Sequence, residues 1–352
     1  MSPVVLVTGA TGFTGGHLVR ALAADGHRVR VIVRPGARAA GLFPPGVEIV
    51  VGDITDRATV ERAVTGAHLI YHLAAVYREA KHRDAHYALV HVEATGRLLD
   101  AARAHQVQRF VHCSTVGVHG HIASPPADEG APYGPEDIYQ QTKLEAERLA
   151  RSYHDGGGLA VAVARPTAIY GPGDTRLLKL FRMIERRRFI VLGSGEIYYH
   201  MVYVHDLVRG LRLLGTHPHA PGEVFILGGE HYHTLREVAA LIAEAVGVSP
   251  SWLRLPARPF QILGSLCEKV CIPFGIEPPI HRRRVDFYTK SRAFTIEKAK
   301  RVLGYHPEVS LREGIETTTE WYRAHGYLNA VRRGTEAVLL FVLDAGGRLE
   351  LL

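Results

Sequence analysis

Tyr139 and Lys143 are the residues whose types and spacing most directly suggest catalysis. A spacing of four places both side chains on one face of a helix. A free tyrosine, with a pKa of about 10, is a poor base at neutral pH, but a nearby ammonium and an oxidised nicotinamide both favour its phenolate. Tyr139 could then exchange a proton with a substrate alcohol or carbonyl while hydride moves, and Lys143 could also hold the nicotinamide ribose.

A second hydroxyl beside this pair would orient the substrate oxygen. Ser114 and Thr115 stand at the end of an apolar run over residues 109–114 that predicts a strand. Open α/β sheets bind ligands at the carboxyl ends of their strands, so both hydroxyls are catalytic candidates. A Tyr-x-x-x-Lys spacing by itself also fits a surface tyrosine beside a lysine. The strand-end hydroxyl and the glycine-rich turn at residues 9–15 together favour the catalytic interpretation.

The glycine-rich turn separates an apolar run at residues 3–8 from a helical pattern at residues 13–24. Glycine allows a tight turn and a close approach of the backbone to a pyrophosphate, and the free amides of the helix N-terminus attract the anion. This strand–turn–helix context predicts a dinucleotide site rather than an ordinary tight turn. The expected contacts are Gly9, Thr11, Gly12, Phe13, Thr14 and Gly15.

Arginine at the end of the second predicted strand bears on the choice of dinucleotide. An acidic residue there would bind the ribose 2′-hydroxyl of NAD, whereas an arginine accommodates the 2′-phosphate of NADP. The strand at residues 29–33 is followed by Arg34 and then Arg38, with no acid. Either arginine could hold a phosphate with two hydrogen bonds, although stacking on adenine or simple solvation would also explain it. We expect NADP(H) to be favoured over NAD(H).

Further cofactor contacts are expected after the next two strands. Asp53 and Ile54 follow the strand at residues 47–51, where the carboxylate can accept from the adenine amino group. The small residues after the strand at residues 68–73 would leave room for the cofactor backbone. Alternatively, they serve only close packing of the protein itself. These residues are Leu73, Ala74 and Ala75.

Apolar runs and helical patterns alternate along the first half of the chain. Continuous apolar strands that alternate with helices indicate βαβ units and a parallel sheet buried on both faces. We therefore expect an α/β fold: a Rossmann-type doubly wound parallel sheet with a smaller, mixed C-terminal substrate-binding lobe. The expected strands are 3–8, 29–33, 47–51, 68–73, 109–114 and 159–165, and the main helices are 13–24, 84–105 and 136–154.

The regular alternation of strands and helices ends at about residue 172, and short helices and proline-containing loops are expected after it. We assign residues 1–172, with returning segments at about 202–228, to the dinucleotide-binding domain. Residues 173–201 and 229–330 form the substrate-binding lobe. The tail, 331–352, has two apolar runs around Asp344-Ala345-Gly346-Gly347 and predicts a hairpin that must pack on its own subunit or on a partner.

The composition is that of an ordinary globular protein, with 47% hydrophobic and 22% charged residues among 352. The net charge is +7, but the arginines are dispersed, so we expect no nucleic-acid partner. Three cysteines do not suggest a disulfide framework, and we expect no metal site. We find no signal peptide and no run long enough to span a membrane, and expect a cytoplasmic protein acting on a small molecule.

These motifs together resemble the extended short-chain dehydrogenases/reductases, the NAD-dependent epimerase/dehydratase family, over roughly residues 3–328. The resemblance implies that Pro166 and Ile169 lie against the nicotinamide and that Thr115 rather than Ser114 is the catalytic hydroxyl. It also implies a homodimer formed by the helices at 84–105 and 136–154. The matching segments are 8–15, 52–53, 73–75, 114–115, 139–143, 165–173, 202–207 and 298–305.

Two departures from the family pattern concern histidines. His91 stands where the family often has an asparagine in the helix after the fourth strand, which puts that structural contact in doubt. His119 stands where many members have a tyrosine before Gly120. It could reach the substrate or be a half-buried histidine at the end of a strand.

Several positions bear on which reaction of the family is expected. Val116-Gly117 after Thr115 lacks the acid–base pair of the dehydratases, and Tyr199 stands where nucleotide-sugar enzymes place a phosphate-binding arginine. Residues 277–299 resemble the 3β-hydroxysteroid and sterol dehydrogenase-like branch. The apolar segment 259–273 could form a wall for a hydrophobic substrate or could equally be ordinary core packing. We expect an NAD(P)-dependent dehydrogenase or reductase for a hydrophobic, sterol-like alcohol or ketone. The alternatives are a nucleotide-sugar 4-epimerase with tightly held NAD and a non-catalytic dinucleotide-sensing regulator.

Overall fold

The structure is a computed structural model in which defined parts of the chain can be described. These parts are residues 3–37, 41–76, 84–250, 253–256, 258–260, 262, 289–329, 341–343 and 349–351. Arg38 and most of the apolar segment 259–273 lie outside the described residues. Cys267 and Cys271 lie outside them as well.

A seven-stranded sheet forms the centre of the molecule, and all its neighbouring strands run parallel. The order across the sheet is β10-β6-β5-β4-β1-β2-β3. Six strands confirm the predicted apolar runs, and the returning segment near residue 224 adds the seventh. The strands are β1 Val4–Thr8, β2 Arg28–Val33, β3 Glu48–Val51, β4 Ala67–His72, β5 Arg109–Cys113, β6 Val161–Pro166 and β10 Val224–Leu227.

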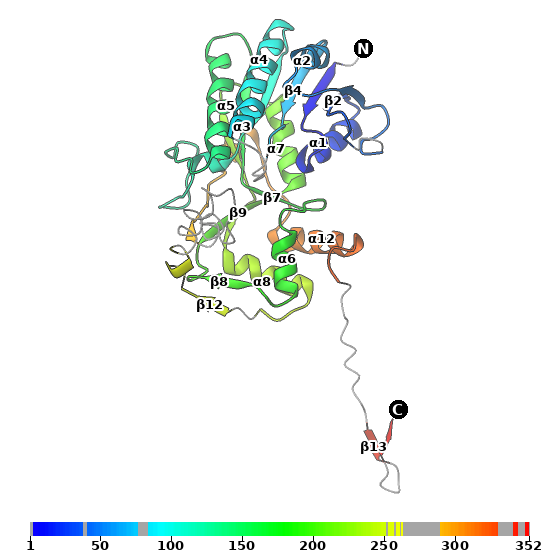
Figure 1. Ribbon diagram of the computed structural model, residues 1–352, viewed down its shortest axis with the longest axis vertical. Helices are drawn as coiled ribbons and strands as arrows, with labels where there is room; N and C mark the ends of the chain where they lie inside the picture. Colours follow the sequence, from blue (N-terminus) through cyan, green and yellow to red (C-terminus); the bar gives the residue numbers. More distant parts are fainter. Residues whose placement is uncertain are drawn as a thin grey trace, which may run out of the picture.

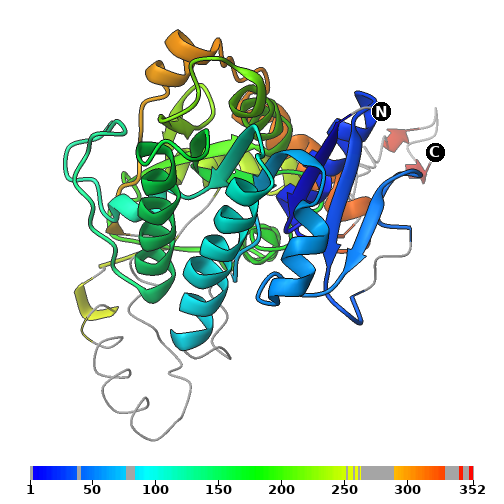
Figure 2. The same ribbon diagram turned by 90° about the horizontal axis from the view of Figure 1, so that it is seen from above.

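Helices cover both faces of this sheet, which confirms the doubly wound α/β fold. Leu18, Leu207 and Leu303 belong to the apolar core on one face, and Val60 and Leu98 to the core on the other. Figure 2 shows α4 and α5 side by side on the same face of the sheet. The first face carries α1 Phe13–Ala24, α7 Val204–Thr216 and α11 Glu297–Leu303; the second carries α2 Arg57–Val64, α4 Ala94–Ala104 and α5 Ile138–Asp155.

The C-terminal half adds a smaller lobe below the carboxyl edge of the main sheet in Figure 1. Its core is a separate apolar cluster that includes Phe181, Ile242 and Tyr322. A mixed three-stranded sheet in the order β11-β9-β7 lies between this core and the main sheet. The elements are β7 Ala168–Tyr170, α6 Leu178–Glu185, β8 Ile190–Leu192, β9 Tyr198–Tyr203, β11 Tyr232–Thr234, α8 Leu235–Val246, β12 Leu253–Leu255 and α12 Leu311–Ala324.

Two helical segments differ from the expectation. The helix predicted at 84–105 is interrupted by a π-helical turn, Leu89–Glu93, between α3 (Asp84–Ala88) and α4. Such turns often occur at functional sites. The segment 202–214, which was expected to return to the main sheet, is mostly the helix α7 and packs on a face of that sheet, because its buried residues recur at helical spacing.

The end of the chain contains one further strand pair. β13 (Phe341–Leu343) pairs antiparallel with β14 (Leu349–Leu351), which is the pairing expected of a hairpin.

Candidate functional site

The order of the main sheet places a crevice between β1 and β4. The chain adds β2 and β3 on one side of β1 and then returns to place β4 on the other, so the connections after β1 and β4 diverge. Ligands of such sheets bind outside the carboxyl ends of the strands at this switch point. A cavity of about 370 Å³ lies there. Its lining includes Gly9, Gly12, Phe13, Thr14, Gly15, Leu73, Ala75, Ser114, Thr115, Tyr139, Lys143, Pro166 and Ile169.

The glycine loop leaves no room for side chains at two of its positions. Gly9 has a φ of +72°, and a Cβ there would lie 2.7 Å from the backbone nitrogen of Ala74. A Cβ on Gly15 would lie 2.2 Å from the carbonyl oxygen of Gly9. No described side chain caps the N-terminus of α1, where Gly12 is the N-cap residue. The amides of this first turn are therefore suited to a pyrophosphate.

Tyr139 and Lys143 come from the first turns of α5. Asp137 caps this helix by accepting a hydrogen bond from the backbone nitrogen of Gln140 at 2.9 Å. Lys143 is only 3% exposed, and its Nζ donates to the carbonyl oxygen of Cys113 at 2.6 Å. Burial lowers the pKa of Lys143 from its usual value. Both side chains line the cavity, so the expected pair faces the space reached by the glycine loop.

The two candidate hydroxyls after β5 have different environments. Ser114 is buried, and its hydroxyl donates to Oε2 of Glu147 at 2.6 Å. Thr115 is half-buried, and its Oγ1 accepts from the backbone nitrogen of Gly117 at 3.0 Å. Among the described residues, nothing accepts the hydroxyl hydrogen of Thr115. The geometry therefore favours Thr115 as the hydroxyl available to a substrate.

A buried ion pair occupies the region behind Ser114. Arg165 and Glu147 are 1% and 0% exposed, and Nε of Arg165 donates to Glu147 at 3.1 Å. Arg165 also donates to Nε2 of His119 at 2.9 Å. His119 is 3% exposed, and its Nδ1 lies 3.2 Å from the carbonyl oxygen of Pro132. Both ring nitrogens of His119 are thus used inside the protein, and the structure favours the buried interpretation of this residue over substrate contact.

His91 connects three parts of the site from within the π-helical turn. Its Nε2 accepts from the backbone nitrogen of Val76 at 3.0 Å, so its Nδ1–H donates to Oγ1 of Thr142 at 2.8 Å. Its ring centroid lies 5.6 Å from that of Tyr139 in an edge contact. Burial lowers the pKa of His91 to about 3, so the ring is neutral. His91 therefore joins the backbone after β4 to α5.

The predicted adenine-side residues lie at neighbouring strand ends, outside the lining of the cavity. Arg34 is exposed directly after β2, and no described residue forms an ion pair with it. Oδ1 of Asp53 accepts from the backbone nitrogen and the hydroxyl of Thr55 at 2.9 and 2.8 Å. Ile54 is buried. Ala74 lies against Gly9, and its backbone nitrogen donates to the Thr8 hydroxyl at 3.3 Å.

Two arginines that were not predicted from the sequence, Arg176 and Arg292, line the cavity. Arg176 forms an ion pair with Asp174 at 2.7 Å, and its guanidinium lies 5.3 Å from the ring centroid of Phe13. Arg292 lies beside β9, because its backbone nitrogen donates to the carbonyl oxygen of Tyr198 at 2.9 Å. The turn that precedes Arg176 could have indicated it, but no local pattern marks Arg292.

No group of three or more His, Cys, Asp or Glu side chains in the described part of the chain is arranged to hold a metal ion. No helix there combines the length and the apolar composition that crossing a bilayer requires.

Comparison with known proteins identifies the family. The model of the NAD dependent epimerase/dehydratase family matches residues 5–228. The chain belongs to this family. This member is 31% identical over 344 residues to a 3 beta-hydroxysteroid dehydrogenase/Delta 5-->4-isomerase of Mycobacterium tuberculosis, with 90% of each chain covered.

Solved structures agree with this family assignment. Gox2253 has a TM-score of 0.80 and 29% identity, over 93% of this chain and 100% of the other. MoeE5 in complex with UDP-glucose and NAD has a TM-score of 0.72 and 27% identity, over 91% and 99%. Proteins similar to this chain thus have either a steroid or a nucleotide sugar in their printed names.

Proposed function

We propose that this family member is an NAD(P)-dependent oxidoreductase that interconverts a secondary alcohol and a ketone, with Tyr139 as the general acid/base. The observation that carries the proposal is the convergence of Tyr139, Lys143 and Thr115 on one cavity with the glycine loop. A non-catalytic dinucleotide sensor would need neither the tyrosine nor the lysine at this place.

Each residue has a separate task in this mechanism. A bound nicotinamide dinucleotide would accept or supply the hydride. Oη of Tyr139 takes the proton from the substrate hydroxyl during oxidation and returns it during reduction. Thr115 donates a hydrogen bond to the substrate oxygen, and the ammonium of Lys143 favours the phenolate of Tyr139 by its charge. The hydrogen bond from Lys143 to Cys113 keeps that ammonium in place.

The proposed substrate is a hydrophobic, sterol-like alcohol or ketone. Leu73, Val116 and Ile169 give the cavity apolar walls, and Tyr199 lines it where nucleotide-sugar enzymes are expected to have an arginine. The similarity to the mycobacterial steroid dehydrogenase supports the same substrate class. For the cofactor we propose NADP(H) over NAD(H), because Arg34 is exposed after β2 and no acid stands there.

A nucleotide-sugar 4-epimerase is the second candidate, and Arg292 is the observation that favours it. This arginine lines the cavity next to Tyr199 and forms no ion pair with any described residue. It could therefore bind a diphosphate even though Tyr199 cannot. The similarity to MoeE5, which was solved with UDP-glucose, supports this alternative.

The substitution Tyr139→Phe tests the proposal. It should lower kcat/KM with a 3β-hydroxysteroid by roughly 100-fold or more, because the proton exchange is lost, while the affinity for the dinucleotide stays unchanged. Tyr198→Phe, an exposed tyrosine outside the cavity lining, is the matched control. Full turnover by Tyr139→Phe would contradict the proposed role. Turnover of UDP-glucose without release of the cofactor, and none of the steroid, would establish the epimerase instead.

A further inference from the structure

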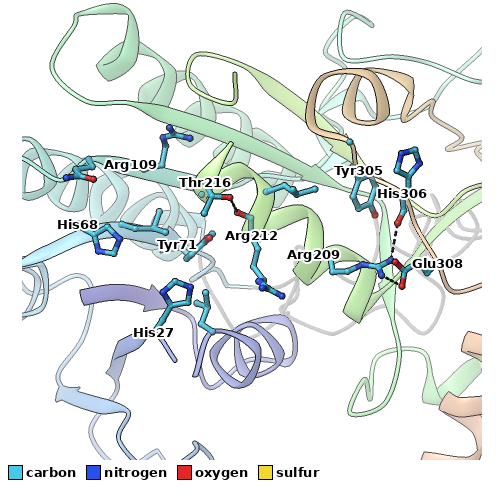
Figure 3. A pocket seen from close by; sticks show the side chains of 16 residues that line it. His27, His68, Tyr71, Arg109, Arg209, Arg212, Thr216, Tyr305, His306 and Glu308 are labelled. Atoms are coloured by element: carbon cyan, nitrogen blue, oxygen red, sulfur yellow. Dashed lines mark hydrogen bonds and ion pairs between the residues drawn. The ribbon is translucent and has the colours of Figure 1, made fainter. Parts of the chain in front are cut away.

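A second cavity, of about 670 Å³, lies at the opposite edge of the main sheet (Figure 3). His68 and Arg109 stand at the amino ends of β4 and β5, and His27 directly precedes β2. Gly215 belongs to the last turn of α7. The glycine loop follows the carboxyl end of β1, so this cavity is separate from the site already described. Its size is within the usual range for small-molecule sites, about 300–1,000 Å³.

Tyr71 on β4 brings a hydroxyl to this cavity. The residue is only 1% exposed, and no described residue forms a hydrogen bond with its hydroxyl. A Cβ on Gly215 would lie 2.1 Å from the Tyr71 oxygen, so the glycine makes room for it. Burial raises the pKa of Tyr71, so the hydroxyl keeps its proton and can donate.

Arg109 brings a positive charge to the same place. Its Nη1 donates to the carbonyl oxygens of Leu214 and His217 at 3.0 and 3.1 Å, at the end of α7. Its Nε is buried and has no hydrogen-bond partner, and no described acidic residue forms an ion pair with Arg109. The positive charges of Arg212 and Arg109 both act on the Tyr71 hydroxyl.

The two other arginines of the cavity already have acidic partners. Arg212 forms an ion pair with Asp25. Arg209 forms ion pairs with Asp206, at 2.6 Å, and with Glu308. Figure 3 shows Arg209 beside Glu308, away from Tyr71 and Arg109. Arg109 is therefore the arginine of this cavity whose charge is not balanced by a described acidic residue.

We propose that this cavity is a binding site for a small organic anion, with a compact phosphate or carboxylate group on an apolar body. The anionic group would accept hydrogen bonds from the Tyr71 hydroxyl and from the guanidinium of Arg109. The apolar body would lie against Leu22, Leu69 and Leu213, which also line the cavity. Hydroxyl and guanidinium donors form their strongest hydrogen bonds with charged acceptors.

Calorimetry with phenyl phosphate tests this site, using protein saturated with NADP so that the glycine loop is occupied. Tyr71→Phe should weaken binding about tenfold, as expected for a lost hydrogen bond to a charged group. The same variant should keep its melting temperature without the probe, because its hydroxyl has no internal partner. Tyr322→Phe is the control: this buried tyrosine belongs to the core of the lobe, outside the cavity lining, and its hydroxyl donates to the carbonyl oxygen of Asp174, so melting should fall and affinity stay.

Two further measurements test the arginine and the anionic group separately. Arg109→Lys keeps a positive charge but lacks the planar guanidinium, and it should also weaken phenyl phosphate binding. Phenol, which has the ring without the phosphate, should bind at least tenfold more weakly than phenyl phosphate. Equal affinity of the wild type and both variants for phenyl phosphate would overturn the proposal. So would the absence of binding to the wild type, or equal binding of phenol.

Discussion

The histidine at position 91 shows how one buried side chain can set the position of a catalytic group. Its two hydrogen bonds join the backbone after β4 to the helix that carries Tyr139, and its ring contacts the tyrosine ring directly. An asparagine amide also has one donor and one acceptor group, which explains why histidine can serve at a position where related proteins are expected to have asparagine.

We expect His91→Ala to lower kcat by about tenfold and the free energy of unfolding by about 1–3 kcal/mol, because Val76 and Thr142 lose a buried partner. His91→Asn should retain most of kcat. Steady-state kinetics and denaturant unfolding measure both effects. His68→Ala, which loses one hydrogen bond to Val4 far from the catalytic cavity, is the control and should change only stability. Wild-type kcat in His91→Ala would show that the residue has only a structural role.

Substitution of Arg34 tests whether this residue makes the protein prefer NADP over NAD. Its side chain is exposed after β2 and has no described partner, so it is free to bind a 2′-phosphate. Arg34→Ala should weaken NADP binding about tenfold, or about 1.4 kcal/mol, and leave NAD binding unchanged. Fluorescence titration with both dinucleotides measures this. An equal loss for NAD and NADP would instead indicate stacking of Arg34 on adenine.

At the scale of elements, α4 and α5 pack against each other on one face of the sheet (Figure 2). The π-helical turn before α4 leaves Leu89 and Val92 only half-buried, and Leu149 on α5 is also half-buried. We propose, as the family resemblance implies, that these helices pair with those of a second subunit. Half-buried apolar residues on such a face would become covered in the dimer.

This proposal predicts that the purified chain has twice the mass of one subunit in light scattering. Val92→Asp should shift the population toward the monomer, because it would bury a charge at the subunit contact. Val302→Asp is the matched control, since Val302 is a half-buried valine on α11, on the other face of the sheet. A wild-type monomer at all concentrations, or an unchanged dimer in Val92→Asp, would contradict the proposed interface.

At the scale of the whole molecule, buried histidines link stability to pH. Burial lowers the pKa of His72 and His91 to about 3 and that of His200 to about 4. The unfolded chain protonates its histidines near pH 6.5, so below that pH it binds protons that the folded protein does not. The stability that these neutral histidines contribute is therefore fully present above pH 6.5. This contribution is lost as the pH falls toward their lowered pKa values.

The free energy of unfolding should decrease between pH 7 and pH 5, with each of these histidines contributing about 2 kcal/mol at pH 5. Urea unfolding at a series of pH values measures this. His200→Gln should make the decrease less steep, whereas substitution of the exposed His219 by glutamine should not change it. A free energy of unfolding that stays constant over this range would contradict the buried, neutral state of these side chains.

The main sheet and the smaller lobe contribute different residues to the catalytic cavity. The main sheet brings the glycine loop, Thr115 and the start of α5 to its carboxyl edge, and the lobe adds Tyr199 and Arg292 across the cavity. Figure 1 shows β7 and β9 between the main sheet and the helices of the lobe. The substrate would therefore bind between two separate apolar cores.

Local patterns in the sequence determined the parallel α/β fold and the glycine loop. They also determined that Tyr139 and Lys143 lie on the same side of a helix. Each depends on residues close together in the chain: a continuous apolar strand, a turn that only glycine can make, or a spacing of one helical turn. These features were predicted because short-range sterics and hydrophobic periodicity do not require knowledge of distant contacts.

The tertiary structure decided which neighbouring side chains are free to act. Ser114 turns to Glu147, His119 is held by Arg165, and His91 reaches both Val76 and Thr142. In each case a hydrogen bond joins residues 15 to 51 positions apart. Such pairings depend on burial, where an unpaired polar group is costly, and only the packed chain determines which partner satisfies it.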